Sequence, residues 1–226
     1  RDLHYPLRRQ RQMCIRDRGY GAVGNDHPIS TANRYHNANL PQRELDLDKA
    51  SFHYKKSGHS GKIKLAAADS AFAGAVDAAQ LMANSAKKAG IDIEVIREPN
   101  DGYWSNVWNN DAKGWCACYW GGRPAETMMF SAAYVAESNW NDTMWKTTDS
   151  AVKFNKLVKD ARKELDESKK RDILYECQRL IYDDGGLLCP LFNSYVSANS
   201  KKIAHGKIAA NWDSDGAKCV ERWWFA

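Results

Sequence analysis

A predicted strand, helix and second strand follow one another between residues 62 and 96, and this order constrains the fold more than any other feature. Residues 62–68 (KIKLAAA) predict a short strand, and residues 91–96 (IDIEVI), closed by Pro99, predict the next one. Between them we expect a helix capped by Asp69 or Ser70 and stopped by Gly90. Such a unit crosses over right-handed onto a parallel sheet, so the sequence predicts an α/β fold.

Further elements flank this unit. A helix is expected over residues 46–58, a short one over 103–110 and a Met/Ala-rich one over 125–135. Two long amphipathic helices follow, one opened by Thr148 or Asp149 and the other opened by Asp166 or Ser168 and stopped at Gly185–Gly186. Residues 114–120 (GWCACYW) predict a buried strand, and residues 187–198, which contain Pro190, predict an extended edge segment.

Composition excludes several classes of protein. Of the 226 residues 43% are hydrophobic and 27% charged, without a repeat, which excludes disorder and coiled coil. No apolar stretch approaches the roughly 20 residues of a membrane-spanning helix. The formal charge of +5 would favour nucleic-acid binding, but six Arg and only two Asp lie within residues 1–18, so the remainder is almost balanced. We therefore expect no nucleic-acid partner.

Residues 1–18 are expected to be non-native. Residues 12–18 (QMCIRDR) resemble an in-frame translation of a transposase end used in sequencing libraries, and such scars are kept out of fold reasoning. The alternative is a natural basic tail. The adaptor hypothesis implies that the reading frame was cut just before Gly19 and that the remainder is a C-terminal fragment.

Several segments appear together in an order that resembles a known family. They are DLDKASFHYKKSG, KKAGIDIEV, GWCACYWGGRP, NWNDTMW, ELDESKKRDILYECQRLIYDDGG and LLCPLFNSYV. This set is similar to the C-terminal half of the peptide-type solute-binding proteins of bacterial ABC importers, the dipeptide, oligopeptide and nickel group. The resemblance implies a two-lobed clamshell of α/β class, its mixed sheet flanked by helices, that closes on a solute. Residues 19–188 would form the second lobe, and residues 189–226 would return to the missing first lobe.

The same resemblance implies a function. The chain would belong to an extracytoplasmic, periplasmic or lipid-anchored protein, with its signal peptide missing from this fragment. It would bind a short peptide or similar solute as a monomer and deliver it to a membrane permease. We expect no catalysis and no cofactor.

The resemblance also suggests the binding residues. In oligopeptide-type members the strand at the position of residues 114–119 lines the cleft and pairs with the extended ligand. Cys118 stands where the family has a carboxylate for the ligand's ammonium group, so the chain departs from the pattern there. Arg123 could instead contact a ligand carboxylate or phosphate. The expected ligand-binding residues are Trp115, Cys116, Cys118, Tyr119, Trp120, Arg123 and Asn193.

Alternatives remain open for these residues. The tryptophans could simply fill a core, and Arg123 could be a turn residue paired with Glu126. A glycan-active enzyme could use Asp111 and Glu126 as paired carboxylates in a Trp-lined groove, and an oligosaccharide-binding protein could use the same aromatic rings. The Cys and His residues show no metal-ligand spacing, so no metal site is expected.

Overall fold

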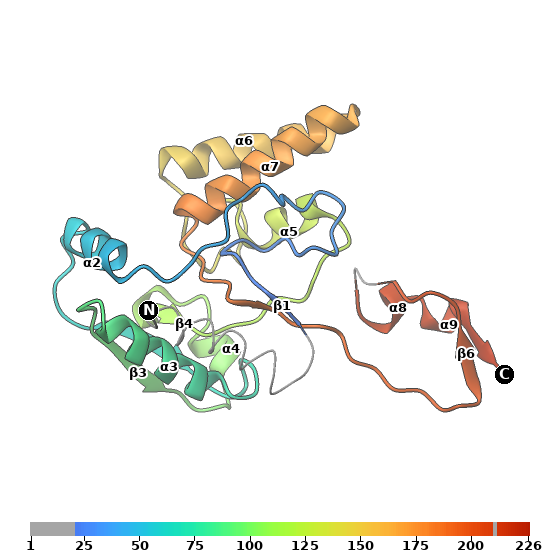
Figure 1. The fold of residues 1–226 in the computed structure, drawn as a ribbon, viewed down its shortest axis with the longest axis horizontal. Helices are drawn as coiled ribbons and strands as arrows, with labels where there is room; N and C mark the ends of the chain where they lie inside the picture. Colours follow the sequence, from blue (N-terminus) through green and yellow to red (C-terminus); the bar gives the residue numbers. More distant parts are fainter. Residues whose placement is uncertain (1–20, 210–211) are drawn as a thin grey trace, which may run out of the picture. The chain divides into compact units, whose positions relative to one another are not determined.

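The computed structural model describes residues 21–209 and 212–226, which form two compact units (Figure 1). We call residues 44–120 the sheet unit, and residues 21–43, 121–209 and 212–226 the helix unit. Helices and small sheets alternate along the chain, which confirms the predicted α/β class. The adaptor-like segment 1–18 lies outside the described residues. The expected division at residue 188 stays a prediction.

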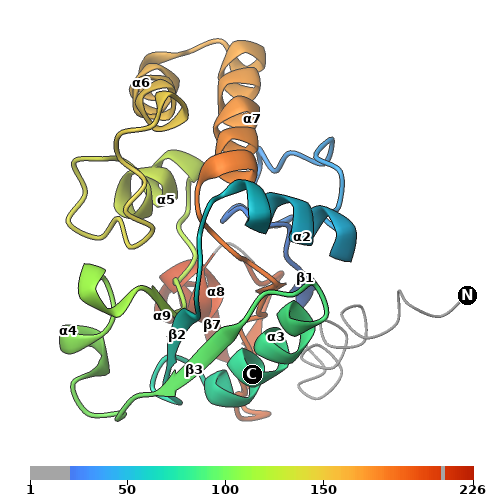
Figure 2. The ribbon, with the colours of Figure 1, turned by 90° about the vertical axis from the view of Figure 1, so that its left-hand side faces the viewer.

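The sheet unit is built around a central parallel strand. Strand β2 (Ile63–Ala67) pairs with β3 (Ile93–Arg97) on one side and with β4 (Trp115–Cys116) on the other, both in parallel. Helix α3 (Ala75–Lys87) connects β2 to β3 and lies alongside them in Figure 2. The predicted βαβ unit is therefore confirmed. Helix α2 (Leu47–Lys56) precedes it and is capped by the Asp46 carboxylate, which accepts from the Lys49 amide.

The predicted start of α3 is wrong. The helix begins at Ala75, not after Asp69 or Ser70. The Asp69 carboxylate accepts from the Gly74 amide at 3.2 Å, and the Ser70 amide donates to the Asn100 side chain at 2.9 Å. Gly74 adopts a left-handed φ of 81°, which glycine tolerates best. These contacts turn residues 69–74 into a tight loop before the helix.

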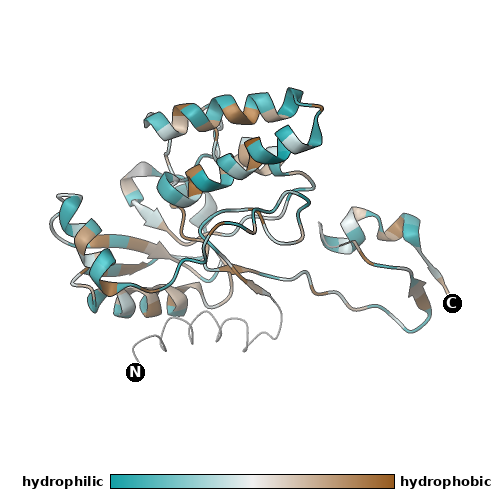
Figure 3. Ribbon diagram, turned by 45° about the horizontal axis from the view of Figure 1, so that its top comes forward, coloured by the Kyte–Doolittle hydropathy of each residue, from teal (hydrophilic) through white to brown (hydrophobic). Residues whose placement is uncertain are grey.

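Small side chains let the helices approach the sheet closely. On one face of β2, Ala66 and Ala68 lie in a cluster with Tyr103 and Val107. On the other face, Leu65 and Ala67 contact Ala79 of α3. Figure 3 shows the strands of this unit as mostly hydrophobic. The alternation of a strand thus gives β2 two buried faces.

The helix unit contains the two long amphipathic helices that the sequence predicts. Helix α6 (Asp149–Lys163) is capped by Thr148, and α7 (Glu167–Asp184) is capped by Asp166. In each case the capping side chain accepts from an amide in the first turn. The two helices lie side by side in Figures 1 and 2, and the shorter α5 (Glu126–Ala133) belongs to the same unit.

Aromatic and polar side chains share the core of the helix unit. The Phe154 ring packs between Phe130 and Trp145, with ring centroids 5.4 and 5.1 Å away. Gln178 of α7 is fully buried: its side-chain oxygen accepts from the Asn37 amide at 2.8 Å and its nitrogen donates to the Tyr35 carbonyl at 2.8 Å. Gln178 therefore ties residues 35–37 to α7.

Short antiparallel pairs complete the helix unit. Strand β1 (Ala22–Val23) pairs with β5 (Leu191–Phe192), so only two residues of the predicted extended segment 187–198 join a sheet. Strand β6 (Ile203–His205) pairs with β7 (Trp223–Phe225). Between β6 and β7 lie two short helices, α8 (Asp213–Ala217) and α9 (Cys219–Arg222). The backbone of α8 is left-handed at Ser214–Gly216. Among the described residues, no helix is long and apolar enough to cross a membrane.

His27 is a buried imidazole in the helix unit. It is 0% exposed, and its Nδ1 accepts from the Ile29 amide at 3.4 Å. No hydrogen-bond partner of its Nε2 is found in the described part of the chain. Burial, and secondarily the neighbouring His36, lowers the pKa of His27 from 6.5 to about 4. The folded state therefore holds this histidine neutral where the unfolded chain would protonate it.

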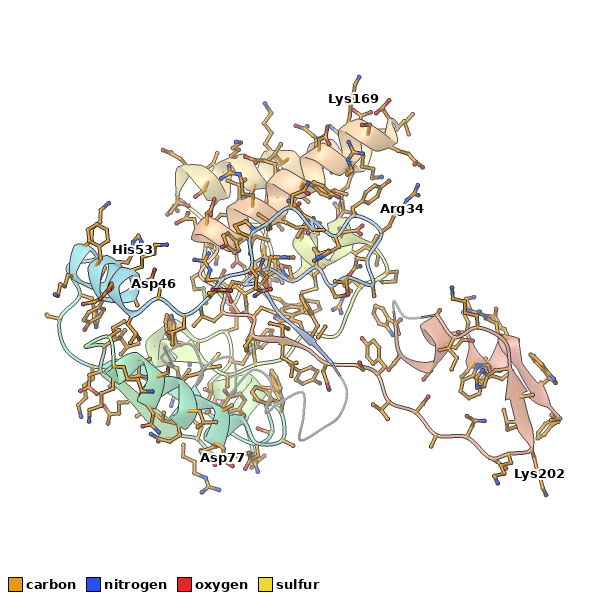
Figure 4. All side chains as sticks on the ribbon, in the orientation of Figure 1. Arg34, Asp46, His53, Asp77, Lys169 and Lys202 are labelled. Carbon is orange, nitrogen blue, oxygen red and sulfur yellow. The ribbon has the colours of Figure 1, made fainter. Side chains whose placement is uncertain are left out.

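We predict that this histidine makes the unit acid-sensitive. Its folded-state pKa is depressed, so its contribution is complete above pH 6.5 and is lost as the pH falls from 6.5 towards 4. The full loss is about 3 kcal/mol of unfolding free energy. Urea denaturation between pH 7 and 4 measures it, and His27→Phe should flatten the acid slope. His53→Ala, at an exposed site on α2 (Figure 4), is the control and should leave the slope unchanged. An equal slope in His27→Phe would contradict the prediction.

Candidate functional site

Strand β4 places the predicted binding segment at an edge of the parallel sheet. The Ala117 amide donates to the Ala66 carbonyl of β2 at 2.8 Å. Successive residues of a strand direct their backbone groups to opposite sides, so the backbone groups of Cys116 and Ala117 alternate in direction. Strand addition is one way in which an extended ligand binds at a sheet edge.

The predicted burial of this strand is wrong. Regular pairing covers only Trp115 and Cys116, and the Trp115 side chain is 45% exposed. Tyr119 is 61% exposed, whereas Cys116, Cys118 and Trp120 are half-buried. A strand that lies at a sheet edge and is not covered on both faces leaves its large side chains accessible. Trp115 and Tyr119 therefore do not simply fill the core of the sheet unit.

Tyr103 fixes the neighbouring helix to the sheet. It begins α4 (Tyr103–Asn106) directly after Gly102, whose φ is 71°. The Tyr103 side chain is 1% exposed, and its hydroxyl donates to the Ala117 carbonyl at 2.6 Å, with the Ala66 carbonyl 3.3 Å away. Burial, followed by the nearby Cys116 and Cys118, raises the pKa of Tyr103 above its ordinary value. The hydroxyl is therefore a neutral donor that connects α4 to two strands.

Aromatic rings from two segments, residues 104–108 and residues 119–120, form one cluster. Trp104 contacts Tyr119 edge-to-face, with ring centroids 5.4 Å apart, and contacts Trp108 at 5.9 Å. Trp108 in turn contacts Trp120 at 6.0 Å. We call Trp104, Trp108, Tyr119 and Trp120 the aromatic cluster. The structure thus joins two of the predicted binding residues to two rings from α4 and the turn after it.

The two remaining predicted residues lie in the helix unit. Arg123 donates from Nη1 to the carbonyl of Gly121 at 2.7 Å and of Gly122 at 3.2 Å, and its guanidinium carbon lies 5.5 Å from the centroid of the Trp212 ring. Asn193 follows β5 and is exposed. Arg123 therefore supports its own turn as well as being a candidate for anion binding.

The enzyme alternative pairs Asp111 with Glu126, and the side chain of Asp111 lies outside the described part of the chain. Glu126 is 5% exposed, and its Oε1 accepts from the Tyr35 amide at 2.9 Å, which is a structural role. Asp184, which is not part of that pair, accepts from the Ser150 hydroxyl and, at 2.9 Å each, from the Trp145 indole and the Thr148 hydroxyl. The bond from Ser150, followed by those from Trp145 and Thr148, lowers the pKa of Asp184. Both carboxylates thus hold neighbouring segments of the helix unit together.

The cysteine and histidine side chains do not form a metal centre in the described part of the chain. No group of three or more potential ligands from Cys, His, Asp and Glu comes together there. Burial raises the pKa of the Cys177 thiol to about 12, consistent with a small buried core residue.

Similarity to known proteins is found at the level of the fold. No family model and no curated protein matches the chain. Solved structures do match. The periplasmic binding protein DppA from Helicobacter pylori, in complex with the peptide STSA, is 16% identical with a TM-score of 0.66, over 98% of this chain and 44% of that chain. NikA from Staphylococcus aureus, in complex with Ni(L-His)2, gives 16% and 0.66, over 93% of this chain and 45% of that one.

The chain has the fold of ABC-transporter substrate-binding proteins. It spans less than half the length of these two neighbours. A further match, the peptide-binding protein of a peptide ABC transporter, is 15% identical with a TM-score of 0.62, over 84% of this chain and 93% of that chain. DppA and this third match are both named as binding proteins. The substrate-binding fold expected from the order of sequence segments is therefore confirmed.

Sequence reasoning missed Tyr103 and the ring partners Trp104 and Trp108 as parts of one assembly. The sequence does carry a signal, because three aromatic residues, Tyr103, Trp104 and Trp108, lie close together in the stretch after Pro99. What the sequence could not supply was the hydrogen bond from the Tyr103 hydroxyl to the Ala117 carbonyl, which sets these rings beside Tyr119 and Trp120.

We predict that Tyr103→Phe lowers the unfolding free energy by about 1.5 kcal/mol, because it removes a buried hydroxyl and leaves the Ala117 carbonyl without this donor. The near-ultraviolet circular dichroism of the Trp side chains should weaken at the same time, since the rings lose their fixed geometry. Tyr54→Phe is the matched control, because the Tyr54 hydroxyl bonds to the Gly61 carbonyl at an exposed site of the same unit. Equal stability and an unchanged spectrum for Tyr103→Phe would refute the anchoring role.

Proposed function

We propose that this chain is part of the extracytoplasmic solute-binding component of an ABC importer and that it binds a short peptide or a related small solute. The observation that carries the proposal is the exposure of the Trp115 and Tyr119 side chains, in β4 and just after it, in a chain with the substrate-binding fold. Exposed rings of this kind can contact the side chains of an extended peptide.

The wider parts of the proposal follow from the same fold. The protein would act outside the cytoplasmic membrane, either free in the periplasm or anchored by a lipid, and would pass its solute to a membrane permease. It would work as a monomer and would not alter the solute. Residues 19–226 would form the C-terminal part of a longer protein, in keeping with the coverage of DppA and NikA.

The identity of the solute is tested by purifying the product of the intact gene without denaturation and analysing the bound small molecules by mass spectrometry. We expect a short peptide that dialysis releases and that rebinds unchanged. Prolonged incubation should leave its mass unaltered. Recovery of a chemically converted product would contradict the proposal, and so would a saccharide as the bound molecule.

Arg123 is proposed to contribute an anion contact to solute binding. Arg123→Ala should then reduce affinity for a peptide with a free carboxylate roughly tenfold, whereas Arg123→Lys should recover part of it, because the charge remains while the bidentate geometry is lost. The same peptide with an amidated C-terminus is the control and should respond little to either change. Unchanged affinity in Arg123→Ala for both peptides would remove Arg123 from the site.

A further inference from the structure

The aromatic cluster is made from two segments without any charged residue. Residues 102–110 (GYWSNVWNN) and residues 114–122 (GWCACYWGG) contain no Asp, Glu, Lys or Arg. Four rings from these segments touch one another, and Trp104 and Tyr119 are 38% and 61% exposed. The cluster thus offers a neutral and accessible aromatic surface beside the edge strand.

The arrangement of the rings favours one kind of partner. The contacts of Trp104 with Tyr119 and of Trp108 with Trp120 have interplanar angles of 86° and 65°, so each ring presents its edge to the face of the next. Aromatic rings prefer this edge-to-face geometry because positive edges meet negative faces. A further aromatic ring can therefore extend the series in the same manner.

Two polar side chains in α4 and the turn after it, those of Ser105 and Asn110, are engaged locally. The Ser105 hydroxyl donates to the Gly102 carbonyl at 3.1 Å. The Asn110 amide group donates to the Asn106 carbonyl at 2.9 Å and accepts from the Ala112 amide at 3.1 Å. A pyranose ring requires hydrogen-bond partners for its hydroxyl groups as well as an aromatic face. Ser105 and Asn110 are engaged in these local bonds and are therefore less available to a sugar.

We infer that the aromatic cluster is a specificity-determining subsite that binds an aromatic side chain of the solute, with Trp104 as its central contact. This inference rests on the proposed peptide-binding function and adds to it a preference among peptides. Trp104 is central because it contacts Tyr119, Trp108 and the anchor Tyr103, whose ring centroid is 5.7 Å away. Tyr119 and Trp120 belong to the segment that follows β4, so a solute that contacts this segment would bring its side chains close to the rings.

The test compares two tripeptides, Ala-Phe-Ala and Ala-Ala-Ala, by titration calorimetry on the intact gene product. We expect Ala-Phe-Ala to bind roughly tenfold more tightly, a difference typical of one aromatic contact with its buried area. Trp104→Ala should remove most of this preference while changing the affinity for Ala-Ala-Ala less than about twofold. Trp104→Phe should retain part of the preference, because a ring remains.

Trp140→Ala is the matched control, because Trp140 is exposed to a similar extent but belongs to the helix unit. It should leave the preference intact. Equal binding of both tripeptides by the parent protein, or an unchanged preference in Trp104→Ala, overturns the inference and leaves the proposed function standing. Binding of neither tripeptide overturns the inference, whereas the proposed function is decided by the co-purified solute. Binding of maltotriose that is lost in Trp104→Ala would assign the cluster to sugars and overturn the inference.

Discussion

The hydroxyl of Tyr103 connects the three parts on which the candidate site depends. It donates to the Ala117 carbonyl beyond β4 and lies 3.3 Å from the Ala66 carbonyl of β2, while its backbone begins α4. A buried hydroxyl without such partners would cost free energy, so the bond and the burial of the ring reinforce each other. With Tyr103 fixed, Trp104 lies beside Tyr119 and the rings become one surface.

The helix unit is held together by a different kind of contact. Its long helices bury an apolar stripe, but buried polar side chains also join backbone segments, both distant in sequence and close to one another. Gln178 binds the backbone of residues 35–37, and Asn141 donates to the Tyr134 carbonyl at 3.3 Å and the Trp145 carbonyl at 3.0 Å. Polar groups buried in this way are specific, because every alternative arrangement leaves them unsatisfied.

Local signals carried most of the sequence prediction, and long-range contacts explain its failures. The Thr148 and Asp166 caps and the βαβ unit depend on neighbouring residues and were found correctly. The start of α3 was misplaced because Asn100, far along the chain, binds the Ser70 amide. Residues 114–120 predict a buried strand, since hydrophobicity alone does not reveal that β4 is a short edge strand. The contact between Trp104 and Tyr119 likewise depends on tertiary structure. The ligand-binding role of the named residues stays a prediction.

The central claim is that the edge strand and its aromatic cluster receive the solute of a substrate-binding protein. A crystal structure of the intact gene product with its co-purified solute tests this most directly. The account predicts an extended solute that lies along residues 115–119 and whose nearest ring lies within about 4 to 7 Å of the Trp104 ring, the range of aromatic contacts. A solute bound away from both β4 and the aromatic cluster would contradict it.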